Sequence, residues 1–436
     1  MKNKLHRTIT VVVIGAFLSL FPAMGKILYA SHTAHQKAVQ PLSPDELAAL
    51  RTKAEQGDTD IQFKLGNLYF YGVEVEEDDA QAGFWYGKAV EGYTKAAEAG
   101  DADACYRLGN LYATAHSAVL DLKKSEECYR EAAAIYRKAA EQGDAHACYR
   151  LGQIYFYGSC GVETNKPLAV DLFHKAAELG DADAQCELGM DYSMGWGVNK
   201  DEVEAAHWYR MAAKQGNAHA QYKLGGCFMS GIGVKQDLKQ AAVWYRKAAE
   251  QDCVDAQVET AVCYADGIGV KKDPKQAAVW YRKAAEQGHD FAQYELGKCY
   301  ALGEGVKKNE KAAVTWYRKA AGQNSGMAQF ELGNCYAKGK GVPQNMQKAV
   351  NWYRKAAKQD IAEAQRCLGD CYARGEGVQK DAAEADYWYN KAGRQESKGG
   401  TAVSPWVLVT LCLLVLAVPT VVITIFVVRK RGRACM

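Results

Sequence analysis

Cysteines are the recurring residues with the most chemistry available to them in this 436-residue sequence, which contains 14 of them. Five lie exactly one interval of 36 residues apart: Cys227, Cys263, Cys299, Cys335 and Cys371. Equivalent residues in neighbouring units of a helical array lie on the order of 10 Å apart, beyond the roughly 7 Å Cα separation that a disulfide tolerates. We therefore interpret these cysteines as small apolar residues of the core between helices.

Metal binding and cofactor binding are not expected. Cys367 and Cys371 lie one helical turn apart and offer two ligands, but the sequence nearby supplies no others, and the nine histidines do not cluster with them. The glycine-rich Gly231–Val234 segment and its copies differ from a phosphate loop because they follow a helix, lack a third glycine and recur in every unit. We interpret these segments as turns.

Catalysis and nucleic-acid binding are also not expected. No Ser/His/Asp or Cys/His arrangement recurs at an interpretable spacing, so the sequence predicts no enzyme and no small-molecule substrate. The formal net charge is +3, from 54 basic and 51 acidic residues. A charge so nearly balanced gives no electrostatic reason to expect a nucleic-acid partner.

The cysteines and the glycine-rich turns belong to a sequence pattern with a fixed period. Tryptophan recurs every 36 residues at Trp208, Trp244, Trp280, Trp316, Trp352 and Trp388. Glycine recurs with the same period at Gly195, Gly231, Gly267, Gly303, Gly339 and Gly375. A period in this range is typical of a solenoid built from one repeated supersecondary unit.

Each unit is predicted to contain two helices, so the fold class is all-α. In the unit from Ala220 to Gln251, Ala220, Leu224 and Phe228 form one stripe of a first helix. Glycine at Gly231 supplies the backbone freedom that a helix end needs. A second helix then runs from about Leu238 through Ala248.

The array is predicted to contain about nine units, with the first two longer by seven residues. Leu65, Leu108 and Leu151 are 43 residues apart, and Tyr86 is echoed by Tyr93 in the second helix. Seven residues are close to two helical turns, so these second helices should be two turns longer with an unchanged buried face. Ahead of the array, the capping box that begins at Ser43 predicts a capping helix.

The pattern A-x-A-Q-x-x-L-G-x-x-Y-x-x-G-x-G-V-x-x-D, followed by K-A-x-x-W-Y-x-K-A-A-E-x-G, resembles the Sel-1-like repeat, a relative of the tetratricopeptide repeat. The resemblance covers roughly residues 58 to 394. It implies a right-handed α-solenoid of helix pairs that acts as an adaptor. Members are similar to the lumenal part of an endoplasmic-reticulum degradation adaptor and to many bacterial secreted or periplasmic proteins.

Some bacterial members of the family close each helix pair with a disulfide and have been linked to β-lactam binding or hydrolysis. Cys105 and Cys148 match the first-helix cysteine of that pattern, but Ala140 and Ala177 occupy the partner position. This departure argues against such bridges here. An enzyme acting on the cell wall or on β-lactams remains the alternative to an adaptor, and a structural assembly factor whose membrane helices mediate the contacts is a third possibility.

The variable positions of the first helix predict a protein-binding surface. One position is mostly aromatic, and a polar, variable position follows it four residues later on the same helix face. First helices line the concave surface of helical-repeat superhelices, where aromatic side chains make good peptide contacts; the alternative is that the aromatics only pack between units. The predicted stripe consists of Phe63, Asn67, Tyr106, Asn110, Tyr149, Gln153, Tyr222, Tyr294, Lys298, Phe330, Asn334, Arg366 and Asp370.

Two apolar segments flank the array. Trp406–Val428 contains no charge over 23 residues and predicts a transmembrane helix. Thr8–Gly25 is also uncharged and follows Lys2, Lys4 and Arg7, which fits either a cleaved signal peptide or an N-terminal anchor. Basic residues precede the first segment and follow the second, so both ends should remain in the cytoplasm.

The sequence therefore predicts a single-pass membrane protein, or a two-pass membrane protein if the first apolar segment is retained. Its repeats would face the periplasm or a lumen, and it would recruit a protein or peptide partner. The absence of any Asn-x-Ser/Thr sequon favours a periplasm. The predicted segments are a signal peptide or N-terminal anchor (1–30), a linker (31–42), a capping helix (43–57), the repeat array (58–394), a linker (395–405), the transmembrane helix (406–428) and a basic cytoplasmic tail (429–436).

This topology is tested with a reporter that is active only outside the cytoplasm. Inserted near Gly399, the reporter should be active, because the repeats and their linker precede the second apolar segment. Fused after Met436, it should be inactive. The reverse pattern would place the repeats in the cytoplasm.

Overall fold

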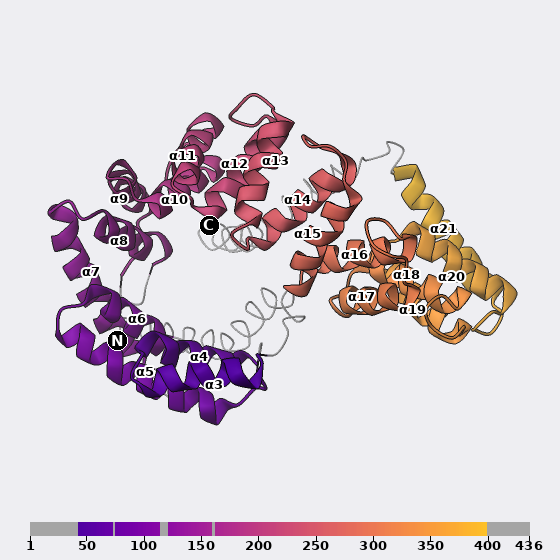
Figure 1. Cartoon of the computed structure of the whole chain (residues 1–436), viewed down its shortest axis with the longest axis horizontal. Coiled ribbons are helices and arrows are strands. Elements are labelled where there is room, and N and C mark those ends of the chain that lie inside the picture. The colour runs from indigo at the N-terminus through magenta and orange to yellow at the C-terminus, as the bar shows by residue number, and fades with distance from the viewer. Residues whose placement is uncertain (1–41, 73–74, 114–120, 159–161, 399–436) are drawn as a thin grey trace, which may run out of the picture. The chain divides into compact units, whose positions relative to one another are not determined.

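A computed structural model describes residues 42–72, 75–113, 121–158 and 162–398, and the regular elements within these residues are all α-helices (Figure 1). The predicted segment 1–30 and the predicted transmembrane helix Trp406–Val428 lie outside the described residues. The helices are α3 (Pro44–Glu55), α4 (Thr59–Tyr71), α5 (Asp79–Glu98), α6 (Ala102–Ala113), α7 (Leu122–Glu141), α8 (Ala145–Tyr157), α9 (Lys166–Glu178), α10 (Ala182–Met194), α11 (Glu202–Lys214), α12 (Ala218–Ser230), α13 (Leu238–Ala249), α14 (Val254–Asp266), α15 (Pro274–Glu286), α16 (Asp290–Leu302), α17 (Glu310–Gly322), α18 (Gly326–Lys338), α19 (Met346–Lys358), α20 (Ala362–Arg374) and α21 (Ala382–Lys398).

From α4 onward the even-numbered helices are the first helices of their units and the odd-numbered helices are the second helices. Each first helix packs against the second helix that follows it. The chain forms two compact parts, a first part up to Ser325 that holds α3 to α17 and a second part from Gly326 that holds α18 to α21. This all-helical succession of pairs confirms the predicted solenoid class, while its right-handed sense stays a prediction.

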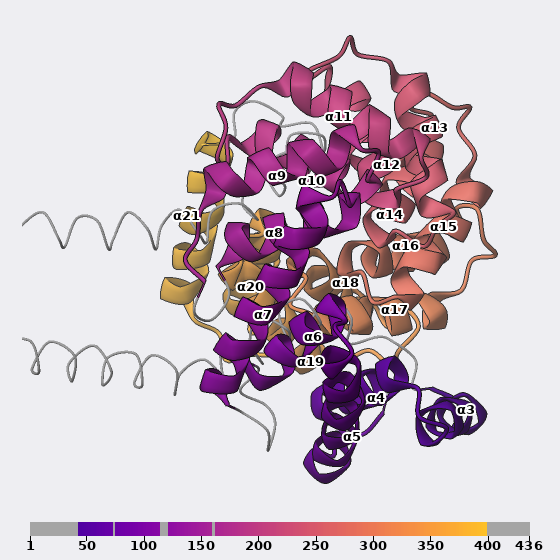
Figure 2. The ribbon, with the colours of Figure 1, turned by 90° about the vertical axis from the view of Figure 1, so that its left-hand side faces the viewer.

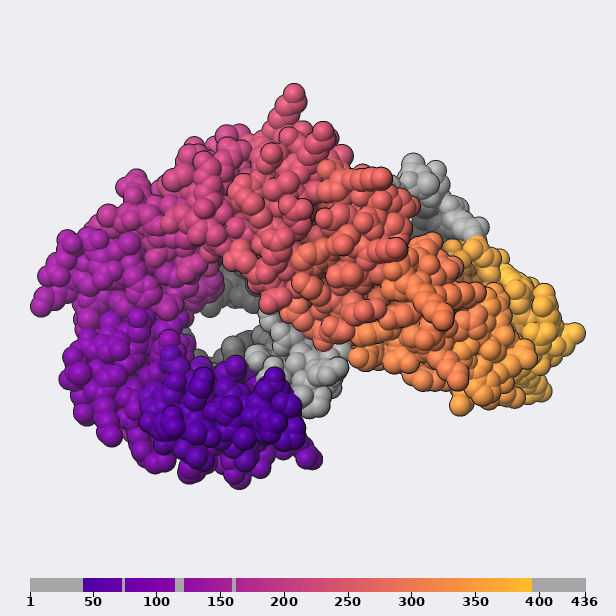
Figure 3. Space-filling model, viewed as in Figure 1, coloured from indigo at the N-terminus to yellow at the C-terminus, as the bar shows by residue number. Residues whose placement is uncertain are grey.

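Within the first part, successive pairs form a curved row. Figure 2 shows the first helices α8, α10, α12 and α14 on the inner side of this row. The second helices α9, α11, α13 and α15 lie on its outer side in the same view. Figure 3 shows the side chains of these pairs closing into one continuous band. We call the surface formed by the first helices of the first part the inner face.

The ends of the helices follow from local sequence. Ser43 forms the predicted capping box with Glu46, whose backbone N–H donates to Ser43 Oγ while its carboxylate accepts from the Ser43 backbone N–H. In the repeats, Asp237 accepts hydrogen bonds from the backbone N–H groups at the start of α13. Gly231 ends α12 in the left-handed conformation, with φ of 73°, so the predicted glycine stop is confirmed.

Glycines at two positions of the repeat, present in most units, permit close contacts that a side chain would block. A Cβ at Gly225 in α12 would lie 2.6 Å from the ring of Tyr245 in α13, so only glycine allows the two helices of the unit to approach this closely. A Cβ at Gly233 would lie 1.9 Å from the carbonyl oxygen of Glu202 in the preceding second helix. The first contact closes the pair, and the second joins neighbouring units.

The longer second helices predicted for the first two units are confirmed. Helices α5 and α7 each contain 20 residues, whereas α9 and α13 contain 13 and 12. In α5 both Tyr86 and Tyr93 are buried, as are Tyr129 and Tyr136 in α7. The insertion therefore extends the buried face by two turns without rotating it.

Buried glutamines connect most first helices to neighbouring second helices, while α6 and α8 have Cys105 and Cys148 at this position. Gln221 in α12 donates from Nε2 to the carbonyl oxygen of Ala213, 3.1 Å away at the end of α11. Its Oε1 accepts from Gln251 Nε2, 2.9 Å away just after α13. The acceptor bond recurs 36 residues later, where Gln257 accepts from Gln287 at 2.9 Å. We call this series the glutamine ladder.

The cysteines of the repeated position lie in the core, as predicted. Cys263, Cys299, Cys335 and Cys371 are buried, Cys227 is half-buried, and all are free thiols. Burial raises the pKa of the Cys263 thiol to about 12 and that of Cys299 to about 11. Such thiols stay protonated and therefore act as small apolar groups.

The tryptophans differ in burial between units. Trp280 is buried, with 8% of its surface exposed, and packs with Ala248, Leu296 and other core residues, whereas Trp244 and Trp316 are half-buried. Lys283 Nζ lies 4.4 Å from the centre of the Trp280 ring and covers its outer side.

Trp280→Ala should lower the free energy of unfolding by about 3–5 kcal/mol, because it leaves a large cavity in this core. Chemical denaturation followed by circular dichroism measures the change. Trp244→Ala, at the half-buried equivalent position, should cost less. A loss below about 1 kcal/mol for Trp280→Ala would contradict the burial described here.

Candidate functional site

The residues predicted to bind protein lie on the first helices α4, α6, α8, α12 and α16 of the first part and on α18 and α20 of the second. Most are half-buried, while Tyr149 and Tyr294 are buried. The structure therefore brings this stripe to the surface of the first helices, although little of each aromatic ring is accessible. The binding role of these residues stays a prediction.

The aromatic members of the stripe pack against the second helix of their own unit. The centres of the Tyr222 and Tyr245 rings are 5.8 Å apart, and those of Tyr106 and Tyr129 are 5.6 Å apart. The same contact joins Phe63 to Tyr86, Tyr149 to Phe173, Tyr294 to Tyr317 and Phe330 to Tyr353. These rings close each helix pair from within, so packing inside the unit accounts for their aromatic character.

The polar members of the stripe are also used inside the unit. Asn110 Oδ1 accepts a hydrogen bond of 2.7 Å from the Tyr129 hydroxyl. The equivalent bond joins Asn67 to Tyr86, Asn334 to Tyr353 and Asp370 to Tyr389. A tyrosine hydroxyl that is half-buried between helices needs such an acceptor. The asparagines therefore stabilise the fold, whether or not a partner also contacts them.

The remaining members form local polar contacts. Gln153 donates to the Tyr149 hydroxyl at 2.8 Å and accepts from Arg150 at 3.1 Å. Lys298 pairs with Glu295 at 2.8 Å, and Arg366 lies 3.6 Å from Glu363. These contacts occur at the surface, where exchange for contacts with a partner costs little free energy.

The seven-residue insertions have a role that the sequence reasoning did not identify. The inserted Tyr93 donates a hydrogen bond of 2.6 Å to Asp60 at the start of its own first helix. Arg107 of the next unit donates to the same Asp60 oxygen at 2.8 Å. Tyr136 and Asp103 repeat the first contact at 2.6 Å. The duplicated tyrosines are the sequence signal that points to this arrangement, which gives Asp60 and Asp103 a hydrogen-bond donor from the added turns.

Carboxylates on α10 form a second group that the sequence reasoning missed. Asp183, Glu187 and Asp191 are spaced four residues apart and so share one side of the helix. Asp191 is 1% exposed, and its Oδ2 has no hydrogen-bond partner among the described residues. Burial and the neighbouring Glu187 raise the pKa of Asp191 to about 8. The signal in the sequence is an aspartate at the repeat position where five later units have cysteine.

Large apolar side chains are exposed at the ends of first helices. Tyr157 at the end of α8 is 64% exposed, Leu302 at the end of α16 is 61% exposed, and Met194 at the end of α10 is 45% exposed. Trp196, in the turn after α10, contacts Phe156 with ring centres 5.9 Å apart. Exposed apolar groups that recur along one face are typical of protein-binding surfaces.

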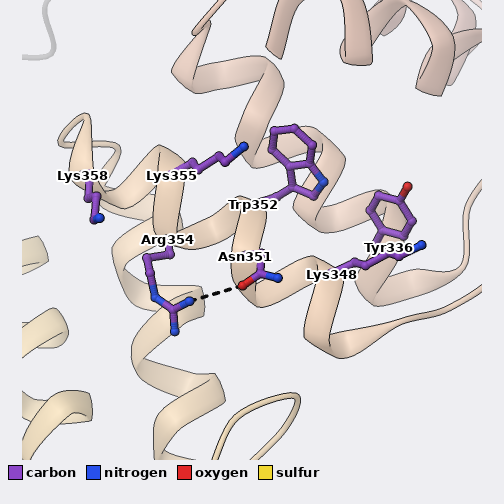
Figure 4. Close-up of a pocket in the computed structure, with 7 residues that line it drawn as sticks. All are labelled: Tyr336, Lys348, Asn351, Trp352, Arg354, Lys355 and Lys358. Carbon is purple, nitrogen blue, oxygen red and sulfur yellow. Dashed lines mark hydrogen bonds between the residues drawn. The ribbon is translucent and has the colours of Figure 1, made fainter. Parts of the chain in front are cut away.

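The second part has a basic groove on α19 (Figure 4). Lys348, Arg354, Lys355 and Lys358 line it together with Tyr336, Asn351 and Trp352. Figure 4 shows Arg354 directed toward Asn351, whose Oδ1 it contacts at 3.3 Å. Lys355 Nζ lies 4.3 Å from the centre of the Trp352 ring. This groove lies mainly on the second helix α19, whereas the predicted stripe lies on first helices.

The described ranges contain neither a metal-binding cluster nor a membrane-spanning helix. Within them, no group of three or more His, Cys, Asp or Glu side chains is placed to hold a metal ion. No helix in the described ranges combines the length and the apolar character needed to cross a membrane.

The fold and this surface define an α-solenoid of paired helices that displays first-helix side chains along one side. The chain belongs to the Sel1 repeat family, whose model matches it repeatedly. Proteins of this family typically mediate protein–protein interactions and are generally not enzymes. The matches cover residues 60–92, 102–144, 145–181, 182–217, 218–253, 254–289, 290–325, 326–361 and 362–397, which confirms the nine predicted units.

Solved structures of other Sel1 repeat proteins are similar to this chain. A protective antigen of uropathogenic Escherichia coli that displays an SLR fold has 33% sequence identity over 79% of this chain and 86% of that chain, with a TM-score of 0.45. A Sel1 repeat protein from Oxalobacter formigenes has 34% identity over 56% of this chain and 96% of that chain, with a TM-score of 0.49. Helicobacter pylori cysteine rich protein B has 30% identity over 30% of this chain and 94% of that chain, with a TM-score of 0.25. No curated protein matches the chain.

The buried carboxyl group of Asp191 makes the stability of the protein depend on pH. Its pKa of about 8 lies above the usual value of 3.8, so the folded protein holds a proton that the unfolded chain releases between these two values. The free energy of unfolding should therefore fall as pH rises from about 4 to about 8. Asp191→Cys should weaken this dependence and raise the free energy of unfolding at pH 8 by about 1–3 kcal/mol. Urea denaturation across this pH range measures both effects, and an unchanged pH profile would show that Asp191 does not cause it.

Proposed function

We propose that this protein is a membrane-anchored scaffold that binds partner proteins on the inner face of its Sel1 repeat array. The observation that carries the proposal is the series of exposed apolar side chains on that face, in particular Tyr157, Met194 and Leu302. Burial of such side chains by a partner supplies the main driving force of protein association. Second helices expose large apolar groups too, such as Phe84, Val203 and Val279, but Tyr157, Met194 and Leu302 share one position, the last residue of a first helix.

The scaffold is proposed to be held at a membrane with its repeats outside the cytoplasm. The uncharged segment Trp406–Val428 is long enough to span a bilayer, and the basic residues Arg429, Lys430 and Arg431 follow it directly. An array that is tethered in this way meets its partners close to the membrane surface, where the tether raises their effective concentration.

The binding surface is tested by photo-crosslinking in the native cell. A photoreactive phenylalanine analogue that replaces Tyr157 or Leu302 in the full-length chain should yield adducts with other proteins, because both positions lie at exposed ends of first helices. The same analogue at Val243 or Val279, on the second helices α13 and α15, is the matched control. Gel shifts of the tagged protein and mass spectrometry of the adducts measure the result. Crosslinked adducts from the second-helix positions alone would contradict the proposal that the inner face binds the partner.

A further inference from the structure

The basic groove on α19 is lined by four cations, Lys348, Arg354, Lys355 and Lys358. None of them forms a salt bridge with another described residue, and no acidic side chain lines the groove. Arg354 donates to neutral acceptors, at 3.3 Å to Asn351 and at 3.0 Å to the Tyr372 hydroxyl. Asp360, the nearest acid in the sequence, pairs with Lys391 at 3.1 Å. The positive charge of the groove is therefore available to an anion from outside.

The charge of α19 departs from the repeat. At the position of Lys358, the units of α13 and α15 have Glu250 and Glu286. Glu250 lies 3.6 Å from Arg246, one turn earlier, and forms a salt bridge with it. In α19 the same two positions are Arg354 and Lys358, and like charges four residues apart on a helix repel each other. An attraction within the helix is thus replaced by a repulsion, and nothing within α19 balances the charge.

The turn that leads into α5, in the first unit, has the opposite charge. It contains four consecutive exposed acids, Glu76, Glu77, Asp78 and Asp79, which we call the acidic turn. Asp78 caps α5 by accepting from the backbone N–H of Ala80 at 3.0 Å. Glu76 and Asp79 form no salt bridge with another described residue. Later units have lysine at the position of Glu76, as in Lys235 and Lys271.

Formal charge therefore changes sign between the first unit and the eighth. Residues 44–79 contain ten acidic and three basic residues, a net charge of −7. Residues 326–358 contain one acidic and six basic residues, a net charge of +5. The acidic turn belongs to the first unit and the basic groove to the eighth. A molecule with complementary charges on two distinct surfaces attracts other copies of itself.

We propose that the basic groove of one molecule binds the acidic turn of a second copy of this chain, so that copies associate head to tail. Carboxylates of the acidic turn pair with the lysine and arginine side chains of the groove through charge-assisted hydrogen bonds. The groove has a volume of about 580 Å³, within the range of binding clefts. Because the two surfaces differ, each molecule offers its groove to one neighbour and its acidic turn to another. This association goes beyond the proposed function, since it needs no partner protein.

The experiment measures the protein mass of the full-length chain in detergent by size-exclusion chromatography with light scattering. At low salt the mass should rise with protein concentration and exceed that of a dimer, because a head-to-tail contact leaves a free surface at each end. At about 1 M salt the mass should be that of one copy, since screening weakens contacts between exposed charges.

Two variants separate the two surfaces. The groove variant carries Lys348→Gln and Lys358→Gln, and the turn variant carries Glu76→Gln and Asp79→Asn. Each should self-associate about tenfold or more weakly than the original protein, because charge-assisted contacts are lost. An equimolar mixture of the two should form dimers and nothing larger. In that mixture the groove variant still supplies the acidic turn, and the turn variant still supplies the groove.

The control variants make the same charge changes on other second helices. Lys239→Gln with Lys275→Gln, and Glu250→Gln with Glu286→Gln, alter exposed residues of α13 and α15 or directly after them. Both should associate like the original protein, and circular dichroism should show that every variant is folded.

Three results would overturn the proposal. The first is an original protein that has the mass of one copy at every concentration at low salt. The second is an equal loss of association in the control variants, because bulk charge would then explain it. The third is a mixture of groove and turn variants that does not form dimers. None of these results affects the crosslinking test at Tyr157 and Leu302, so the scaffold function is judged separately.

Discussion

The close approach of the two helices in each unit is the constraint on which the rest of the array depends. In most units it exists because a glycine of the first helix faces an aromatic ring of the second, as Gly225 faces Tyr245 with no room for a Cβ. The contact brings the tyrosine hydroxyl within reach of the first helix, where an asparagine such as Asn110 accepts its hydrogen bond in several units. The aromatic residue three positions before the glycine, such as Tyr222, remains partly exposed at the surface. Fold and surface are therefore shaped by the same interhelical distance.

This constraint explains why the fold was readily predicted and the candidate site only in part. The period of 36 residues, the glycine helix ends and the two-turn insertions are local or periodic features, and a periodic sequence displays them directly. The tyrosine that bonds to Asn110 lies 19 residues away on another helix. A variable polar position looks the same in sequence whether it serves a partner or a tyrosine of its own unit. Only the interhelical geometry shows that Asn67 and Asn334 are already engaged.

The role of the carboxylates on α10 could not be predicted for a related reason. In the next unit they are replaced by residues of a different kind. Glu187 stands where the next unit has Lys223, and Asp191 stands where it has Cys227. Such departures from the repeat carry information only when neighbouring units are seen side by side, because each substitution alone resembles ordinary surface variation. The departure of Asp191 was visible in sequence, but its burial and its unpaired oxygen were not.

The glutamine ladder limits the ways in which the repeat array can gain or lose sequence. From Gln185 to Gln329, the buried glutamine of each unit accepts a hydrogen bond from the glutamine that follows the second helix of the same unit. Removal or duplication of one complete stretch of 36 residues among these units therefore joins equivalent partners and preserves this bond. A loss of any other length would shift the register and orphan polar groups in the core. The ladder therefore favours gain or loss of whole units over gain or loss of fragments of a unit.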